Sequence, residues 1–208
     1  DNRLYTLGDC FLEVVSPVKP NTAAGRFLDR RGGDGGYMVI VQVEDLAHEQ
    51  ARLANTSIRT VFADDRGTAK AIHLHPKDVP GAIPSLDEMT PPESWLWAGE
   101  GWERRGGRHV GRILAAEIRS LDPHETGLRW AEAYGRSLLP VGDQWRLDLG
   151  NTYIRFIYES AAVEPALMAI DFEALDLPGV CAAADDLGLE RDNHVVTVCG
   201  VDFNFLSP

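Results

Sequence analysis

The feature that most constrains the fold of this chain is a recurring order of elements: a strand, a helix, then several short strands. From residue 37 onward, the first strand of each repeat is apolar and leads into an amphipathic helix. Further strands follow that helix. The order recurs with a period of about 50 residues, which indicates an internal repeat. A unit of this size has one apolar sheet face to bury, so units are expected to pair. The sequence therefore predicts an α+β protein and excludes a doubly wound sheet, in which helices alternate with single strands.

One complete unit is predicted in the first half of the chain. Its helix begins after Asp45, a residue type that caps helix N-termini well. A hairpin with a Gly8-Asp9 turn and a short helix at 23–30 precede this unit, so the hairpin would be the back half of a unit truncated at its N-terminus. The strands of the hairpin and of the complete unit are expected at 3–7, 10–16, 37–43, 58–63, 69–75 and 81–87.

Two further units are predicted in the second half, with helices at 122–134 and 177–187. Their strands are expected at 112–120, 145–149, 153–159, 167–174, 194–199 and 201–206. Three tryptophans lie in the Gly- and Pro-rich segment between the halves, where we expect them to pin the segment to a domain face or to a partner subunit rather than to stack on a ligand. The predicted organisation is a first domain over 1–90, a linker over 91–109 and a second domain over 110–208.

Charge and composition exclude several classes of partner. The formal net charge of −12 repels nucleic acid and anionic membrane surfaces. Neither an apolar run of about 18 residues nor a leader segment is visible. The three cysteines form no CxxC pair, which favours a reducing, cytoplasmic location. A small molecule is therefore the expected partner, and a homodimer is the expected assembly.

Three short motifs resemble one superfamily. Residues 7–17, LGDCFLEVVSP, are similar to a hairpin of the vicinal oxygen chelate proteins, which include glyoxalases, bleomycin resistance proteins and extradiol dioxygenases. Val43-Glu44-Asp45-Leu46 resembles the strand-to-helix junction of that superfamily, and His75-Pro76-Lys77 resembles a turn in relatives of methylmalonyl-CoA epimerase. The resemblance covers nearly the whole chain. It implies βαβββ units that pair into two curved mixed sheets around a cavity.

The resemblance also implies where a divalent metal would be held, because the enzymes of this superfamily commonly bind one between symmetry-related strands. Glu13 keeps a ligand position and would be either a metal ligand or the general base that removes a proton next to a carbonyl. Other positions have departed: Tyr37 and Met38 stand where a histidine is expected, and Ser85 stands where a glutamate is expected. In the second half the corresponding positions fall near Ala115, Arg155, Met168 or Ala169, and Asn204.

Two histidines offer an alternative metal site. His73 and His75 lie two residues apart on a predicted strand, so both could reach one ion together with Glu13. The other interpretation is that His75 caps the turn before Pro76 and that His73 occupies a half-buried sheet position. A site without metal is the favoured expectation.

Two functions remain open from the sequence. The first is a lyase, isomerase or epimerase that works through an enolate, or a related oxygenase. The second is a non-catalytic protein that binds or sequesters a small molecule in a degenerate, metal-free site. Arg155 could bind an anionic group of the ligand, or could pair with Glu159 or Asp148. The residues predicted to line the pocket are Phe11, Met38, Ser85 and Arg155, with Phe62, Trp145 and Phe156 as further candidates.

Overall fold

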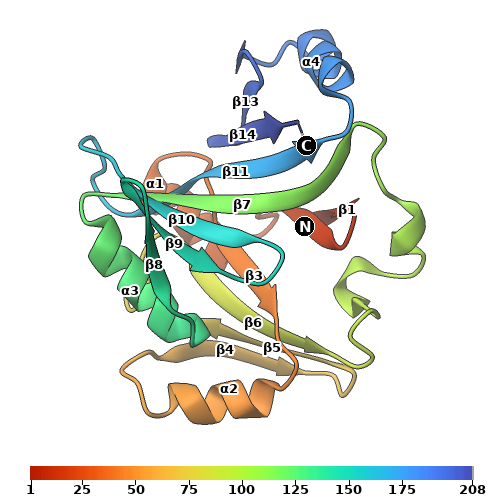
Figure 1. Ribbon diagram of the computed structural model, residues 1–208. Coiled ribbons are helices and arrows are strands. Elements are labelled where there is room, and N and C mark those ends of the chain that lie inside the picture. The colour runs from red at the N-terminus through yellow and green to blue at the C-terminus, as the bar shows by residue number, and fades with distance from the viewer. Residues whose placement is uncertain (208) are drawn as a thin grey trace. The chain divides into compact units, whose positions relative to one another are not determined.

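The computed structural model describes residues 1–207 and shows an α+β chain with four α-helices, two 3-10 turns and many short strands (Figure 1). The helices are α1 (Ala23–Arg31), α2 (Leu46–Leu53), α3 (Pro123–Tyr134) and α4 (Leu177–Asp186), and the 3-10 turns are η1 (Leu96–Ala98) and η2 (Trp102–Arg104). The strands of the first half are β1 (Asn2–Leu7), β2 (Cys10–Val15), β3 (Met38–Gln42), β4 (Thr60–Asp65), β5 (Ala69–Leu74) and β6 (Ile83–Met89). The remaining strands are β7 (Val110–Ser120), β8 (Leu138–Val141), β9 (Gln144–Asp148), β10 (Tyr153–Tyr158), β11 (Ala166–Ala174), β12 (Arg191–Asp192), β13 (Val195–Val198) and β14 (Val201–Leu206).

The predicted repeat is present three times as a complete βαβββ unit. The hydrogen-bonded strand orders are β3-β6-β5-β4, β7-β10-β9-β8 and β11-β14-β13-β12, so in each repeat the first strand lies beside the fourth. The first strand runs parallel to the fourth in the pairs β3–β6 and β11–β14, whereas the other pairs described within these repeats are antiparallel. The mixed sheets confirm the predicted α+β class.

The chain divides into two compact units that do not follow the boundaries at 90 and 110 predicted from the sequence. Unit 1 contains residues 1–37, 101–116 and 168–208, and unit 2 contains residues 38–100 and 117–167. Strands β7 and β11 begin in one unit and end in the other. Sequence patterns mark where elements begin and end, but they do not report which distant segments pack together.

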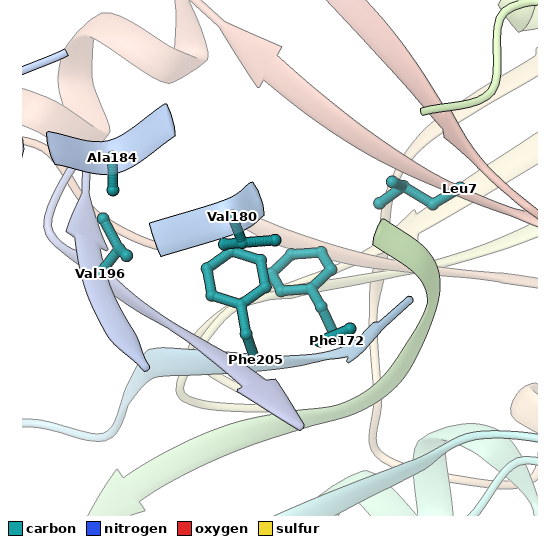
Figure 2. Packing of buried hydrophobic residues seen from close by; sticks show 7 residues of the cluster. Leu7, Phe172, Val180, Ala184, Val196 and Phe205 are labelled. Atoms are coloured by element: carbon teal, nitrogen blue, oxygen red, sulfur yellow. The ribbon is translucent and has the colours of Figure 1, made fainter. Parts of the chain in front are cut away.

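Unit 1 packs the hairpin β1–β2, helix α4 and the strands of the last repeat around one apolar core. The hairpin turns at Gly8, whose positive φ of 62° favours glycine. Figure 2 shows Val180 of α4 against the rings of Phe172 and Phe205, whose centroids are 5.6 Å apart. Leu7 of the hairpin belongs to the same buried cluster. The hairpin is thus held by apolar contacts that the last repeat provides.

Unit 2 contains the complete first repeat together with helix α3 and strands β8 to β10. Helix α2 lies along one face of the β4–β6 strands (Figure 1), and its first amide, at Leu46, donates to Glu88 on β6 at 2.7 Å. Trp130 of α3 is fully buried and donates from its indole nitrogen to the carbonyl of Pro80 at 2.7 Å. These contacts leave the second face of the β3–β6 sheet for other partners.

The helix starts predicted from the sequence are confirmed by their caps. Asp45 accepts a hydrogen bond from the amide of His48 at 2.9 Å, and Asp122 accepts one from the amide of Glu125 at 2.9 Å. Two strands were missed. β8 contains Pro140, and β12 spans only Arg191–Asp192, so neither shows an apolar alternation long enough to be recognised.

None of the helices in residues 1–207 combines the length and the apolar character needed to span a bilayer.

Candidate functional site

The strongest candidate site is one face of the β3–β6 sheet in unit 2. Side chains alternate along strands, so residues that are paired in register and spaced by two share a face. We call the face opposite α2 the polar sheet face. Its two rows of cross-strand neighbours are Phe62, His73, Ser85 and Ile40, followed by Asp64, Ala71, Asp87 and Gln42.

A buried carboxylate lies at the centre of the polar sheet face. Asp87 is only 3% exposed, and it accepts hydrogen bonds from the Ser85 hydroxyl at 2.6 Å and from the Trp97 indole nitrogen at 3.0 Å. Burial, with a further contribution from Asp87, raises the pKa of Tyr134 well above its ordinary value, and the Tyr134 hydroxyl donates to the carbonyl of Val39 at 3.0 Å. Asp87 is therefore satisfied by protein donors and stays fixed in place.

His73 is the titratable side chain beside this carboxylate. It lies directly across from Ser85, and its ring stacks on Phe62 with 4.5 Å between the centroids. Partial burial lowers the pKa of His73 below its ordinary value of 6.5, so the imidazole is uncharged at neutral pH. Within residues 1–207 the structure gives this ring no hydrogen bond. His73 thus presents an uncharged imidazole that can still accept or donate a hydrogen bond.

Residues 91–98, which we call the strap, are tied to the polar sheet face at three points. The Gln42 side-chain amide nitrogen donates to the carbonyl of Pro92 at 3.0 Å, and Trp97 donates to Asp87. The Arg66 guanidinium lies 4.8 Å from the centre of the Trp97 ring. These contacts confirm that Trp97 pins the linker to a domain face.

A second buried carboxylate occupies the next repeat within unit 2, in a different electrostatic setting. Glu117 on β7 is 5% exposed and forms ion pairs with Arg155 on β10 at 2.7 Å and with Arg119 at 2.5 Å. The sequence predicts Glu159 or Asp148 as a partner of Arg155, and the structure places Glu117 beside it. In unit 1 the last repeat buries Asp171, which accepts from Asn204 at 2.8 Å. Each complete repeat therefore buries one carboxylate on its first or fourth strand.

Four of the residues predicted from the sequence, including Phe62, lie together on the polar sheet face. His73 and Ser85 are direct neighbours, and Met38 lies on the same face at the start of β3, in register with Ile83. The remaining predicted residues lie elsewhere. Arg155 is on β10 of unit 2, and Phe11 and Glu13 are on the hairpin of unit 1.

The environment of the hairpin residues differs from the one expected for a catalytic site. The Glu13 carboxylate accepts a hydrogen bond from the side chain of Asn2 at 2.6 Å, and Phe11 packs edge-on against Trp102 at 5.0 Å. The further pocket candidates Trp145 and Phe156 also have other roles. Trp145 stacks on His124 at 4.2 Å, and Phe156 is fully buried beside Trp130.

The described residues do not fit a divalent metal. Within residues 1–207 no group of three or more His, Cys, Asp or Glu side chains is placed to hold one. His75 lies beyond the end of β5, and its Nδ1 accepts a hydrogen bond from the amide of Lys77 at 3.0 Å, so it caps the turn. Glu117 is neutralised by two guanidinium groups, which compete directly with any cation.

Sequence reasoning missed Asp87, Glu117 and Gln42. The signal was present, because each is a polar residue that directly follows an apolar residue of its strand, and a buried polar residue is more informative than an exposed one. Recognising it required knowing which side of each strand faces the helix, which depends on register rather than on composition.

A separate pocket of about 290 Å³ lies in unit 2 between the start of α3 and residues 162–165. None of the residues predicted from the sequence lines it.

Comparisons with known proteins identify the type of fold. No known protein family and no curated protein matches the sequence. A solved structure of a hypothetical protein from Staphylococcus aureus is similar over 100% of this chain and 85% of its own, with a TM-score of 0.69 and 11% identity. A mutant of 4-hydroxymandelate synthase from Streptomyces coelicolor is similar over 98% of this chain and 79% of its own, with a TM-score of 0.65 and 12% identity. The Mn(II)-bound glyoxalase from Novosphingobium aromaticivorans is similar over 82% of this chain and 62% of its own, with a TM-score of 0.53 and 8% identity.

At this level of identity the likeness concerns the fold alone. The three complete βαβββ repeats, the placement of a buried carboxylate in each, and these structural neighbours together show that the chain has a fold of the vicinal oxygen chelate type.

Proposed function

We propose that this protein binds a small organic molecule on the polar sheet face and that it does so without a divalent metal. The observation that carries the proposal is the combination of a fixed, buried carboxylate and an uncharged imidazole without a protein hydrogen bond, flanked by accessible apolar side chains. Phe62 is 48% exposed and Ile40 is 39% exposed, on either side of His73 and Ser85. A few convergent polar groups among apolar surface is the usual composition of a small-molecule site.

A fragment screen on the whole protein, followed by two-dimensional NMR, tests this proposal. Ligands of this face should shift the resonances of His73 and lose affinity in Phe62→Ala. The matched control is Val141→Ala, which removes an apolar side chain of similar exposure on β8, a strand of another sheet. If binding fragments shift only residues elsewhere, or if both variants affect affinity equally, the site is wrongly placed.

A second candidate function is catalysis by His73, which takes over the base role expected of Glu13. The uncharged His73 ring can accept a proton at neutral pH, and it has no hydrogen-bond partner within residues 1–207, whereas the Glu13 carboxylate accepts from Asn2. The reaction would be an isomerase, lyase or epimerase step that removes a proton next to a carbonyl.

Deuterium incorporation into neutral carbonyl compounds such as hydroxyacetone, followed by NMR in D₂O, measures this proton removal. Exchange above the buffer rate that disappears in His73→Gln supports catalysis. Exchange at the buffer rate for every carbonyl probe that binds restricts the protein to binding.

A further inference from the structure

One buried polar atom on the polar sheet face has no partner within residues 1–207, and it is an acceptor. The side-chain oxygen of Gln42 is buried and makes no hydrogen bond within residues 1–207. Its assignment as oxygen is fixed by the rest of the amide, because the nitrogen donates to the carbonyl of Pro92, where an oxygen could not donate. A buried acceptor without a donor is costly, so a donor from outside the protein would satisfy it.

The neighbours of Gln42 are acceptors as well. Gln42 lies in register with Asp87 on the adjacent parallel strand, so the unsatisfied oxygen and the buried carboxylate share one face. The Ser85 hydroxyl lies 2.6 Å from Asp87 and 3.2 Å from the carbonyl of Ile72, so its single proton is used within the protein and it offers a ligand no donor. Around Gln42 this face therefore presents acceptors, and the ring N–H of His73 remains a donor beside Ser85.

The charges and rings of this face suit the same ligand chemistry. The charged residues here are Asp64, Asp87 and Arg66, and Arg66 pairs with Asp64 at 2.9 Å, so a carboxylate ligand would add a further negative charge. The Trp97 ring already accepts one planar cation, the guanidinium of Arg66. Planar N–H donors are thus compatible with both the acceptors and the aromatic surface.

We infer that the ligand of the polar sheet face is a donor-rich molecule, carrying an amide, amine or amidinium group that bonds to Gln42 Oε1, and that carboxylates are rejected. This inference rests on the proposed function and narrows its ligand class. This ligand class differs from that of a metal site, where the metal ion would attract an anionic or ketonic oxygen.

Three probes of nearly identical shape test the inference on the full chain. Benzamidine offers donors and a positive charge, benzamide offers donors without a charge, and benzoate offers only acceptors and a negative charge. Titration by NMR should show benzamidine and benzamide binding at least about tenfold more tightly than benzoate. Gln42→Leu should weaken the first two by about tenfold, and Gln42→Glu should strengthen benzamidine relative to benzamide.

The controls separate failure of the inference from failure of the site. Gln50→Leu makes the same substitution on the exposed surface of α2 and should change no affinity, and thermal unfolding of each variant confirms that it folds. If benzoate binds best and its binding is lost in Phe62→Ala, the ligand class is wrong while the site stands. If none of the probes binds in a way that depends on Phe62 or Gln42, the inference and the proposed site both fail.

Discussion

The first complete repeat buries a carboxylate on its fourth strand and the second buries one on its first strand, and the donors that the structure places on the two carboxylates differ. Hydrogen bonds from two neutral donors, Ser85 and Trp97, reach Asp87, whereas Glu117 is held by the guanidinium groups of Arg119 and Arg155. An ion pair of this kind neutralises the carboxylate and occupies the space in front of it. Hydrogen bonds from neutral donors fix a carboxylate but leave its charge in place.

The contrast shows how one repeated scaffold can specialise its copies. Where the central charge is paired internally, as at Glu117, we expect the face not to bind ligands. Where an unsatisfied acceptor and an uncharged imidazole lie beside the carboxylate, as at Asp87, we propose that the face binds a ligand. The difference lies in a few side chains on the paired first and fourth strands, and the backbone order of the two repeats is the same.

The largest effect should come from breaking the Glu117 ion pairs. Arg155→Met leaves a carboxylate only 5% exposed with one fewer cationic partner, and we expect the free energy of unfolding in urea to fall by about 3 kcal/mol. The double variant Arg155→Met/Glu117→Met should recover part of this loss, because it buries no unpaired charge.

The control for this prediction is an ion pair of the same length on the surface. Arg59 and Asp78 are also 2.7 Å apart, but the Arg59 side chain is 60% exposed. Arg59→Met should therefore change stability much less than Arg155→Met. Equal losses in the two single variants would show that burial of Glu117 does not make its pairing important.

A smaller loss of stability is expected when one hydrogen bond to Asp87 is removed. Trp97→Phe removes the indole donor to this buried carboxylate, and we expect a loss of about 1.5 kcal/mol in the free energy of unfolding. Trp145→Phe is the matched control, because the Trp145 ring stacks on His124 and its indole nitrogen makes no hydrogen bond in the described chain. If Trp97→Phe costs no more than Trp145→Phe, the strap is not held by Asp87.

The repeats and their helices could be predicted from the sequence. The side chains that bind each buried carboxylate could not. Apolar periodicity and the caps Asp45 and Asp122 are local signals, so strand and helix positions followed from them. The pairing of Arg155 with Glu117 joins residues 38 positions apart, and it depends on which strands become neighbours. Strand alternation pointed to His73 and the family resemblance to Ser85, but neither could show that Gln42 would lack a donor. The homodimer stays a prediction.

A still smaller effect on stability is expected from pH, and it arises from His73 on the polar sheet face. Burial lowers the pKa of His73 below 6.5, so the unfolded chain takes up this proton at a higher pH than the folded chain. The stabilising contribution is complete above pH 6.5 and is lost as the pH falls through the lowered pKa. Urea unfolding between pH 7.5 and pH 5, a window set around the ordinary histidine value of about 6.5, should therefore show a smaller acid loss in His73→Leu than in the wild type. Identical acid losses would mean that His73 titrates alike in both states.

The smallest expected effect is the response of thermal stability to divalent metals. It tests whether the arginines beside Glu117 exclude a cation. A metal at Glu117 would have to displace the guanidinium groups of Arg119 and Arg155, and at the polar sheet face it would find no cluster of three ligands in the described chain. A ligand stabilises a protein only in proportion to its preference for the folded state. We therefore expect no shift of the melting temperature with Mn²⁺, Zn²⁺ or EDTA, and no metal retained through dialysis, as measured by elemental analysis. Stoichiometric metal that is lost in Glu117→Gln would show that the arginines yield to a cation, and the contrast between the two repeats would then collapse.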